Sequence, residues 1–406
     1  MKRAYYIFLL IFLVIAASPF LVRYLLINKK IGLLNNIYFN SPALITNEKK
    51  CDNYDALLDK TLDSSFSVSI LKNGSLISSH NDDELKVPAS NQKLFSSAYV
   101  LSKYKITNNL RTNLIKAWNN NYYLIGEGDP DLSYSDIYKL LSYIKFNKNI
   151  NINIVEINSK YYWPNGWTKT DKIYEYGAPI TTLAIESNSN NFDNIYPLNK
   201  LIENYLKDKY PSSKIKINNI DLNKLFYLRS TKEIYSIYSN PILSLLTLAN
   251  SESHNFTAES LFKNASNTWN KNIYDELKRW LRNKGLPTSN TNFADASGLS
   301  RENKVTTKLI ALFLDKMRYS NDFKTYQSSL SLLGVRGTLA NRLKDSDLSG
   351  KFFGKTGTLS NVFALSGYLY KDKEPIIVSI IQNSENIDKN KTFYLLNEIY
   401  KLEKCN

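Results

Sequence analysis

Three short motifs place hydroxyl, ammonium and amide groups in an order that suits covalent catalysis. They are an S-x-x-K at 90–93, an S-x-N at 253–255 and a K-T-G-T at 355–358. A serine hydroxyl can attack a carbonyl, a lysine can move the proton, and an amide can hold the substrate. The motifs therefore predict an acyl-transfer site.

The first motif supplies a nucleophile together with its base. Ser90 and Lys93 are three positions apart, and residues at this spacing share one face of a helix, so the Lys93 amine can reach the Ser90 oxygen. A lysine acts as a base only when burial or a nearby positive charge, here that of Lys355, lowers its pKa. At a helix start the Ser90 N–H has no intrahelical partner, so it can form half of an oxyanion hole.

The other two motifs supply groups for proton relay and substrate binding. Ser253 and Asn255 are two positions apart, so both can project the same way, one to relay a proton and one to hold a substrate amide. The K-T-G-T precedes an apolar strand, whose edge can bind an extended peptide. Gly357 leaves room for that peptide, and Lys355 with the two threonine hydroxyls suits a carboxylate.

The S-x-x-K and the S-x-N are each weak evidence alone, and the K-T-G before a strand is more specific. A second S-x-x-K occurs at 69–72, inside an expected strand, and a second S-x-N occurs at 189–191. Only the ordered trio, with each member in suitable local structure, indicates a serine acyltransferase.

Hydrophobic spacing predicts the elements that position these motifs. Strands at 66–71 and 76–79 flank Asn73-Gly74, a strong hairpin signal, and a helix is expected over 90–104. Further helices are expected at 241–249, 258–263, 273–281 and 391–401, and strands at 362–370 and 376–382. The stretch 106–235 is rich in Asn and Tyr and has short strand-like pieces. We therefore expect a catalytic domain formed by 51–105 and 236–406, interrupted by an inserted α+β domain at 106–235.

The N-terminus predicts the compartment. Residues 4–22 carry no charge, a length that can cross a hydrocarbon core of about 30 Å, and Pro19 after the small residues 16–18 disfavours cleavage. We expect a transmembrane signal anchor at 1–28, a spacer at 29–50 and the remainder on the periplasmic side of the plasma membrane. A cleaved signal peptide is the alternative, and Arg23 and Lys29 after the span oppose the expected topology.

Composition excludes several classes of protein. The 406 residues are 43% hydrophobic and 22% charged, which excludes collagen-like and wholly disordered chains and is long enough for about two domains. The net charge of +15 is scattered rather than clustered, so we expect no nucleic-acid partner. Two cysteines cannot form a disulfide framework, but Cys51 and Cys405 can pair in an oxidising compartment if the chain ends meet.

The residues around the motifs resemble the class C low-molecular-mass penicillin-binding proteins, the D-alanyl-D-alanine carboxypeptidase/endopeptidase family (penicillin-binding protein 4-like serine peptidases). The resemblance runs from about residue 66 to residue 368. The segments that carry it are V-P-A-S-N-Q-K at 87–93, S-H-N-F-T-A-E at 253–259, D-A-S-G-L-S-R at 295–301, G-T-L at 337–339 and K-T-G-T-L at 355–359. Within the insertion, G-D-P at 128–130, G-W at 166–167 with Asp171, and A-P at 178–179 also match.

The resemblance implies a role for each candidate residue. The implied catalytic residues are Ser90, Lys93, Ser253, Asn255 and Lys355, and the implied substrate-binding residues are Thr356, Gly357, Thr358, Asp171 and Arg301. The backbone N–H groups of Ser90 and Thr358 would form the oxyanion hole. Asp171 would hold the side-chain ammonium of diaminopimelate, and Arg301 its carboxylate.

The resemblance also implies a fold and a partner set. The fold is α+β: a serine β-lactamase/transpeptidase-like antiparallel sheet flanked by helices, with the inserted domain. Its first and last helices pack together, which favours a Cys51–Cys405 disulfide. Peptidoglycan stem peptides are the expected substrate and β-lactams the expected inhibitors. No metal or cofactor is expected, because the two histidines, His80 and His254, lack the spacing of zinc ligands.

Three departures from the family pattern stand out. His254 replaces an acid or amide in the S-x-N, and we expect it to be structural. Ala296 replaces a glycine, and the stretch between the first two motifs is short enough that one of two inserted subdomains is expected to be missing. The predicted function is a serine D-alanyl-D-alanine carboxypeptidase/endopeptidase. A β-lactamase or esterase of the same fold, or a non-catalytic β-lactam or cell-wall sensor, is the alternative.

Overall fold

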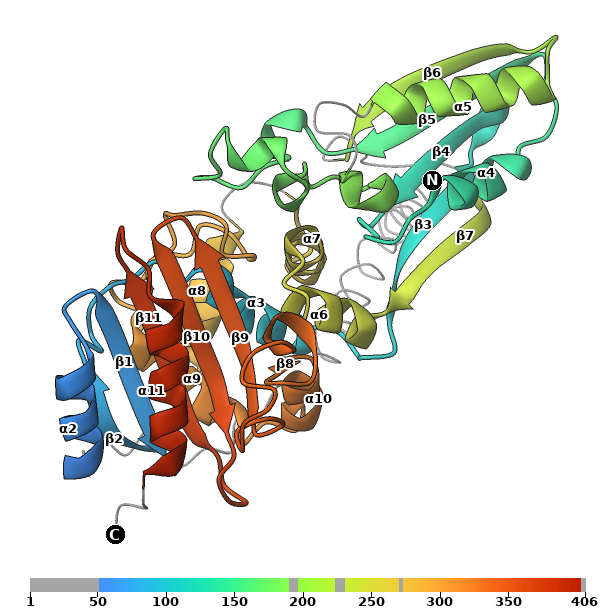
Figure 1. Cartoon of the computed structure of the whole chain (residues 1–406). Coiled ribbons are helices and arrows are strands. Elements are labelled where there is room, and N and C mark those ends of the chain that lie inside the picture. The colour runs from blue at the N-terminus through green and yellow to red at the C-terminus, as the bar shows by residue number, and fades with distance from the viewer. Residues whose placement is uncertain (1–50, 190–195, 223–230, 270–272, 403–406) are drawn as a thin grey trace, which may run out of the picture.

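The molecule has two parts, each built around one sheet, which we call the first and the second half. A six-stranded antiparallel sheet, with strands from both ends of the described chain, forms the centre of the first half (Figure 1). The computed structural model describes residues 51–189, 196–222, 231–269 and 273–402. The strands are β1 (Phe66–Lys72), β2 (Ser75–His80), β8 (Ser331–Leu332), β9 (Phe352–Leu359), β10 (Val362–Leu369) and β11 (Ile376–Asn383), in the order β2-β1-β11-β10-β9-β8. Asn73 and Gly74 have φ values of 50° and 80°, which confirms the predicted hairpin between β1 and β2.

Helices cover both faces of this sheet. Helices α2 (Asp52–Thr61) and α11 (Lys389–Lys401) lie on one face, and α3 (Gln92–Leu101) and α9 (Thr307–Met317) lie on the other (Figure 1). Alternate strand residues serve the two cores: Val378 and Ile380 pack under α2 and α11, whereas Ile377 packs against the α3 and α9 side. Strands β10 and β11 are therefore largely apolar along their whole length, and the predicted mixed α+β fold is confirmed.

A second sheet forms the centre of the second half, which is the part of the chain expected as an insertion. Its strands are β3 (Asn109–Lys116), β4 (Asn121–Gly126), β5 (Asn149–Glu156), β6 (Lys214–Asp221) and β7 (Lys232–Pro241), in the order β6-β5-β4-β3-β7. The β4–β5 and β5–β6 pairs are parallel and the others antiparallel. Helices α4 (Tyr134–Ser142) and α5 (Tyr196–Lys209) pack on this sheet. Strand β7 runs past residue 235, the predicted end of the insertion, because it pairs with β3 before the chain re-enters the first half.

Two helices, α6 (Ile242–Asn250) and α7 (Asn255–Ala265), lie between the two sheets (Figure 1). Helices α8 (Tyr274–Asn283) and α10 (Phe323–Ser328) pack with α3 in the core of the first half. The irregular segment 157–189 of the second half packs on α7 through a small cluster that contains Trp167, Ile180 and Phe256. This segment brings residues of the second half next to the first two motifs.

Some predictions for the two ends of the chain concern residues that the structure does not describe. The expected anchor at 1–28 and spacer at 29–50 lie outside the described residues, and no helix among the described ones is long and apolar enough to cross a membrane. Cys51 is buried at the start of α2, which contacts α11. Cys405 lies outside the described residues, so the Cys51–Cys405 disulfide stays a prediction.

Candidate active site

Ser90 lies in a tight turn between a glycine-lined strand and a glycine-containing loop. The turn, Ala89–Asn91, is a 3₁₀ turn that leads into α3, and Ala89 has a φ of 46°, a conformation rare for residues with a side chain. A Cβ atom on Gly357 would lie 2.9 Å from the Ser90 nitrogen, and one on Gly298 would lie 1.9 Å from the Ala89 oxygen. The absence of both side chains therefore allows β9 and the loop to hold the Ser90 backbone from two sides.

Lys93 is one helical turn further on, and it is fully buried. Its Nζ lies 3.1 Å from the Ser90 Oγ, 2.6 Å from the Asn255 Oδ1 and 2.7 Å from the Ser297 carbonyl oxygen. Burial lowers the pKa of Lys93 from its usual 10.5 to about 7, against the opposing influence of the Asp295 and Glu259 charges. A large fraction of this amine is thus neutral near neutral pH.

The partners of Lys93 determine where its lone pair points. A neutral amine has two N–H bonds and one lone pair, and the Asn255 Oδ1 and Ser297 carbonyl oxygens can only accept hydrogen bonds. When each accepts one N–H, the lone pair is left for the Ser90 hydroxyl, the third neighbour of Nζ. In this geometry the Lys93 amine can remove the proton from the Ser90 hydroxyl, which is the task of a general base.

The S-x-N motif lies at the start of α7, and both of its polar residues line the same pocket as Ser90. Ser253 has a φ of 64°, and Asn255 is buried. The Asn255 Nδ2 donates to the Tyr176 carbonyl oxygen of the second half at 2.9 Å, so its Oδ1 faces Lys93. His254 caps α7 by accepting from the Thr257 N–H, and burial lowers its pKa to about 4, in agreement with the expected structural role.

The K-T-G-T motif lies on β9, half of which has an open edge. Strand β8 pairs with β9 only at Phe353 and Gly354, so 355–359 meets no described strand on that side. Lys355 is fully buried, its Nζ donates to the Thr356 carbonyl at 2.9 Å, and burial together with the Lys93 charge holds its pKa well below the usual range. Thr358 is exposed toward the pocket. The edge is therefore available to an extended peptide.

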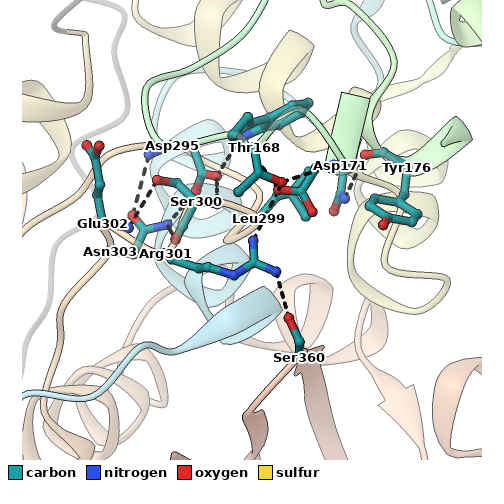
Figure 2. Close-up of polar contacts among 12 residues, drawn as sticks. Thr168, Asp171, Tyr176, Asp295, Leu299, Ser300, Arg301, Glu302, Asn303 and Ser360 are labelled. Atoms are coloured by element: carbon teal, nitrogen blue, oxygen red, sulfur yellow. Dashed lines mark hydrogen bonds and ion pairs between the residues drawn. The ribbon is translucent and has the colours of Figure 1, made fainter. Parts of the chain in front are cut away.

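Asp171 and Arg301 contact each other. The Asp171 Oδ2 accepts from the Thr168 N–H at 2.9 Å and hydroxyl at 2.6 Å, and it pairs with the Arg301 Nη1 at 3.1 Å. The Arg301 Nη2 donates to the Ser360 hydroxyl at 3.0 Å, so this guanidinium spans from the second half to the β9–β10 turn (Figure 2). The expected binding of separate substrate groups thus requires that a substrate replace or extend this ion pair.

One pocket of about 840 Å³ unites most of the candidate residues. It is lined by Ser90, Ser253, Asn255, Thr358, Asp171 and Arg301, together with Thr168, Thr170, Tyr174, Tyr176, Leu299, Leu359 and Ser360. Lys93, Lys355 and Gly357 are buried beside it, and the Thr356 hydroxyl lies 2.7 Å from that of Thr338. The structure thus gathers all ten candidates around one site.

Several groups at the site are not predicted by the motifs. The Ser297 and Tyr176 carbonyls act through backbone atoms, which every residue type possesses, so no residue pattern identifies them. Ser360 is also unpredicted. The Asp295 carboxylate accepts from the Gly298 and Ser300 N–H groups and organises the loop that carries Arg301; its position in the D-A-S-G-L-S-R segment is the signal that identifies it.

Comparison of the sequence with known proteins gives a consistent set of relatives. Residues 54–195 and 195–397 match the model of the D-Ala-D-Ala carboxypeptidase 3 (S13) family. The chain is 32% identical over 145 residues to the D-alanyl-D-alanine carboxypeptidase of Actinomadura sp. (strain R39) and 30% identical over 139 residues to the D-alanyl-D-alanine carboxypeptidase DacB of Haemophilus influenzae. These stretches cover 33% and 32% of this chain but only 27% and 29% of those relatives.

Solved structures with a similar fold cover more of the chain. The crystal structure of penicillin binding protein 4 from Haemophilus influenzae matches with a TM-score of 0.69 at 18% identity, over 86% of this chain and 98% of that one. The predatory peptidoglycan endopeptidase Bd3459 of Bdellovibrio bacteriovorus matches with a TM-score of 0.54 at 14% identity, over 82% and 90% of the two chains. At these identities the match concerns the fold.

Proposed function

The chain belongs to the D-Ala-D-Ala carboxypeptidase 3 (S13) family, and from this premise we propose that it is a serine D-alanyl-D-alanine carboxypeptidase/endopeptidase acting on peptidoglycan stem peptides. The observation that carries the proposal is the environment of Lys93, whose amine has two fixed acceptors, Asn255 and Ser297, and a third neighbour, the Ser90 hydroxyl. A serine with such a base is equipped to form an ester with a substrate acyl group.

The proposed reaction has two halves. The Ser90 Oγ attacks the carbonyl carbon of the penultimate D-Ala while the Lys93 Nζ accepts the hydroxyl proton. The C–N bond then breaks, and the leaving amine, which belongs to D-Ala or to a cross-linked partner, takes up a proton relayed from Lys93 through Ser253. Water attacks the resulting ester, its proton returns to Ser90 through the same base, and the shortened peptide leaves with a new carboxylate.

The surroundings of Ser90 support the binding of such a peptide. The substrate backbone would extend along the open edge of β9 at 355–359, with its terminal carboxylate near Thr356, Thr358 and the Lys355 amine. The Ser90 and Thr358 N–H groups would donate to the oxyanion, where each donor contributes about 10²-fold or more to the rate. We place the reaction on the periplasmic side of the plasma membrane, as expected from 1–28.

The wall of the pocket formed by the second half supports a charged substrate side chain. Asp171 is buried and offers an anion, and the neighbouring Arg301 offers a cation. A side chain that carries both an ammonium and a carboxylate, as diaminopimelate does, can pair with both and replace their mutual contact.

The first test is covalent labelling with a fluorescent penicillin. We expect the full chain to label and Ser90→Ala to lose the label, because the Ser90 oxygen forms the ester. Ser69→Ala is the matched control, since Ser69 begins another S-x-x-K but is buried in β1 against Thr307. An unlabelled wild type, or a Ser90→Ala protein that labels like wild type, would disprove the proposal.

The second test is product analysis by mass spectrometry. We expect release of D-Ala from a pentapeptide that ends in D-Ala-D-Ala, release of a monomer from a cross-linked dimer, or both, with loss of each product in Ser90→Ala. Rapid turnover of the β-lactam alongside slow hydrolysis of both peptides would instead assign the chain as a β-lactamase. Labelling without any turnover would assign it as a sensor.

A further inference from the structure

A short strap of the chain, 295–297, is clamped between the helix that carries Lys93 and the helix that carries Asn255. Its three consecutive carbonyl oxygens all accept hydrogen bonds from α3: from the Gln92 Nε2 at 3.2 Å, the Ser96 Oγ at 2.7 Å and the Lys93 Nζ at 2.7 Å. The last of these oxygens, that of Ser297, is one of the two acceptors that orient the Lys93 amine. The position of this strap therefore determines the orientation of the base.

Glu259 on α7 holds the strap from the other side. It is fully buried, and its Oε1 accepts from the Ala296 N–H at 2.9 Å and the Ser297 N–H at 2.8 Å. Its Oε2 accepts from the Tyr274 hydroxyl at 2.7 Å. One carboxylate thus binds two adjacent N–H groups of the segment whose carbonyls face α3, and a third donor fixes the carboxylate itself.

We propose that Glu259 is a positioning residue for acyl transfer: it fixes the Ser297 carbonyl so that this oxygen takes one N–H of Lys93 and leaves the lone pair for Ser90. Glu259 does not line the pocket, and its effect on the position of the base passes through the strap. The inference rests on the proposed function, because it assigns how the base of that reaction is oriented.

The charge of Glu259 also acts on the base. Lys93 is faced by the carboxylates of Glu259 and Asp295, which favour its protonated form, and by the Lys355 amine and the ring of His254. Glu259 in turn is faced by Asp295, Lys263 and Tyr274, and burial raises its pKa to about 7. The three donors favour the ionised carboxylate. Removal of this charge should therefore lower the pKa of Lys93.

Two substitutions distinguish the effect of the position of the Glu259 carboxylate from the effect of its charge. Glu259→Asp keeps the charge but withdraws the carboxylate from the strap by one methylene, whereas Glu259→Gln keeps the length and an acceptor oxygen but removes the charge. The control is Glu156→Gln. Glu156 is also buried and also accepts from backbone N–H groups, those of Thr182, Ile157 and Leu183, but it lies in the second sheet.

The readout is the rate of acylation of the full chain by fluorescent penicillin between pH 5 and pH 9 (the range that brackets a pKa of about 7). We expect Glu259→Asp to acylate about 10- to 100-fold more slowly at every pH, because small misplacements of a reacting group cost this much. For Glu259→Gln, we expect the acylation rate at high pH to approach that of wild type. The rise of its rate with pH (the acid limb of the curve) should occur at lower pH than in wild type. For Glu156→Gln, we expect the rate to rise at the same pH as in wild type.

The inference fails if Glu259→Asp acylates within about twofold of wild type and Glu259→Gln keeps the wild-type acid limb. A crystal structure of Glu259→Asp gives a readout that does not depend on activity: we expect the Lys93 Nζ and the Ser297 oxygen to separate beyond about 3.5 Å. An unchanged contact there also contradicts the inference. A wild-type chain that penicillin does not acylate would overturn the proposed function instead, and the crystal structure would still test the strap.

Discussion

At the scale of single residues, the site contains two buried lysines whose ammonium groups are costly to keep charged. Burial disfavours the charged form of an amine, and Lys93 and Lys355 are both fully buried. The charge of Lys93 lowers the pKa of Lys355 further. Carboxylates oppose the shift at both amines: Asp295 and Glu259 at Lys93, and Glu252 at Lys355. With a pKa of about 7, Lys93 suits the proposed role of base near neutral pH.

The pH dependence of acylation follows from the lowered pKa of Lys93. The base works when neutral, and its neutral fraction rises as the pH passes upward through about 7, so we expect the acylation rate to rise with pH and to level off above that value. Stopped-flow acylation by a fluorescent penicillin measures this limb. Lys93→Arg, which stays protonated, should lose about 10²- to 10⁴-fold.

A rate for the wild type that is flat between pH 5 and pH 9 would contradict the assignment of Lys93 as the base, since its pKa of about 7 lies within this range. Lys263→Arg is a suitable control for loss of a buried lysine. Lys263 also has a lowered pKa, about 8, but it is not a neighbour of Ser90.

At the scale of elements, the close approach of β9 to the turn at Ala89–Asn91 brings the expected oxyanion donors together. Gly357 lies at this contact, where a Cβ would meet the Pro88 oxygen at 2.8 Å as well as the Ser90 nitrogen. Both obstacles are backbone atoms, which cannot move aside as the end of a flexible side chain can. The K-T-G-T therefore needs its glycine for a contact within the protein, and not only to make room for a peptide.

Gly357→Ala should push β9 away from Ser90. We expect acylation to slow by about 10-fold or more, since the Thr358 N–H would move from its place beside the substrate oxygen. Gly285→Ala is the matched control: its φ of 75° makes the substitution strained, but a Cβ there meets nothing within 4 Å. It should lower the thermal midpoint while acylation stays at the wild-type rate, whereas equal loss of activity in both variants would exclude a specific role for the β9 contact.

At the scale of the whole molecule, the second half reaches the active site at three points. The Tyr176 carbonyl holds Asn255, the Trp167 indole N–H donates to Asp295 at 2.9 Å, and Asp171 pairs with Arg301. Tyr176 and Asn255 line the pocket, as do Asp171 and Arg301, whose contact Figure 2 shows. The second half therefore supports the geometry of the proposed base and also forms part of the proposed substrate-binding surface.

Arg301→Ala should separate these roles. A stem peptide with a side chain that carries an ammonium and a carboxylate would lose the partner of its carboxylate in this variant. We therefore expect its KM to rise about 10-fold, which corresponds to about 1.4 kcal/mol of binding free energy. Acylation by penicillin, which lacks that side chain, should change little. Steady-state assays with peptides that have or lack the charged side chain measure this. Arg111 lies on β3 of the second sheet, so Arg111→Ala should change the KM of neither peptide. Equal KM values for Arg301→Ala and wild type would contradict the assignment.

Local chemistry was predictable from the sequence because it depends on near neighbours. The i, i+3 spacing of Ser90 and Lys93, the Asn73-Gly74 hairpin and the apolar strands at 362–370 and 376–382 all appear in the structure, within one to two residues. The end of the insertion was less predictable, because β7 continues to Pro241 only through its pairing with β3. A strand boundary of this kind is decided by its partner and not by its own residues.

The sequence by itself determined which reactive groups this protein possesses: a serine with a lysine one turn away, a second serine with an amide, and a strand that carries a lysine, a glycine and two threonines. The tertiary structure alone decided how they are oriented. The Ser297 carbonyl that directs the Lys93 amine, the Tyr176 carbonyl that holds Asn255, and the pairing of Asp171 with Arg301 all join segments far apart in the chain. The first two use backbone oxygens, which are alike in every residue, so only the packing of the helices and the strap could select them.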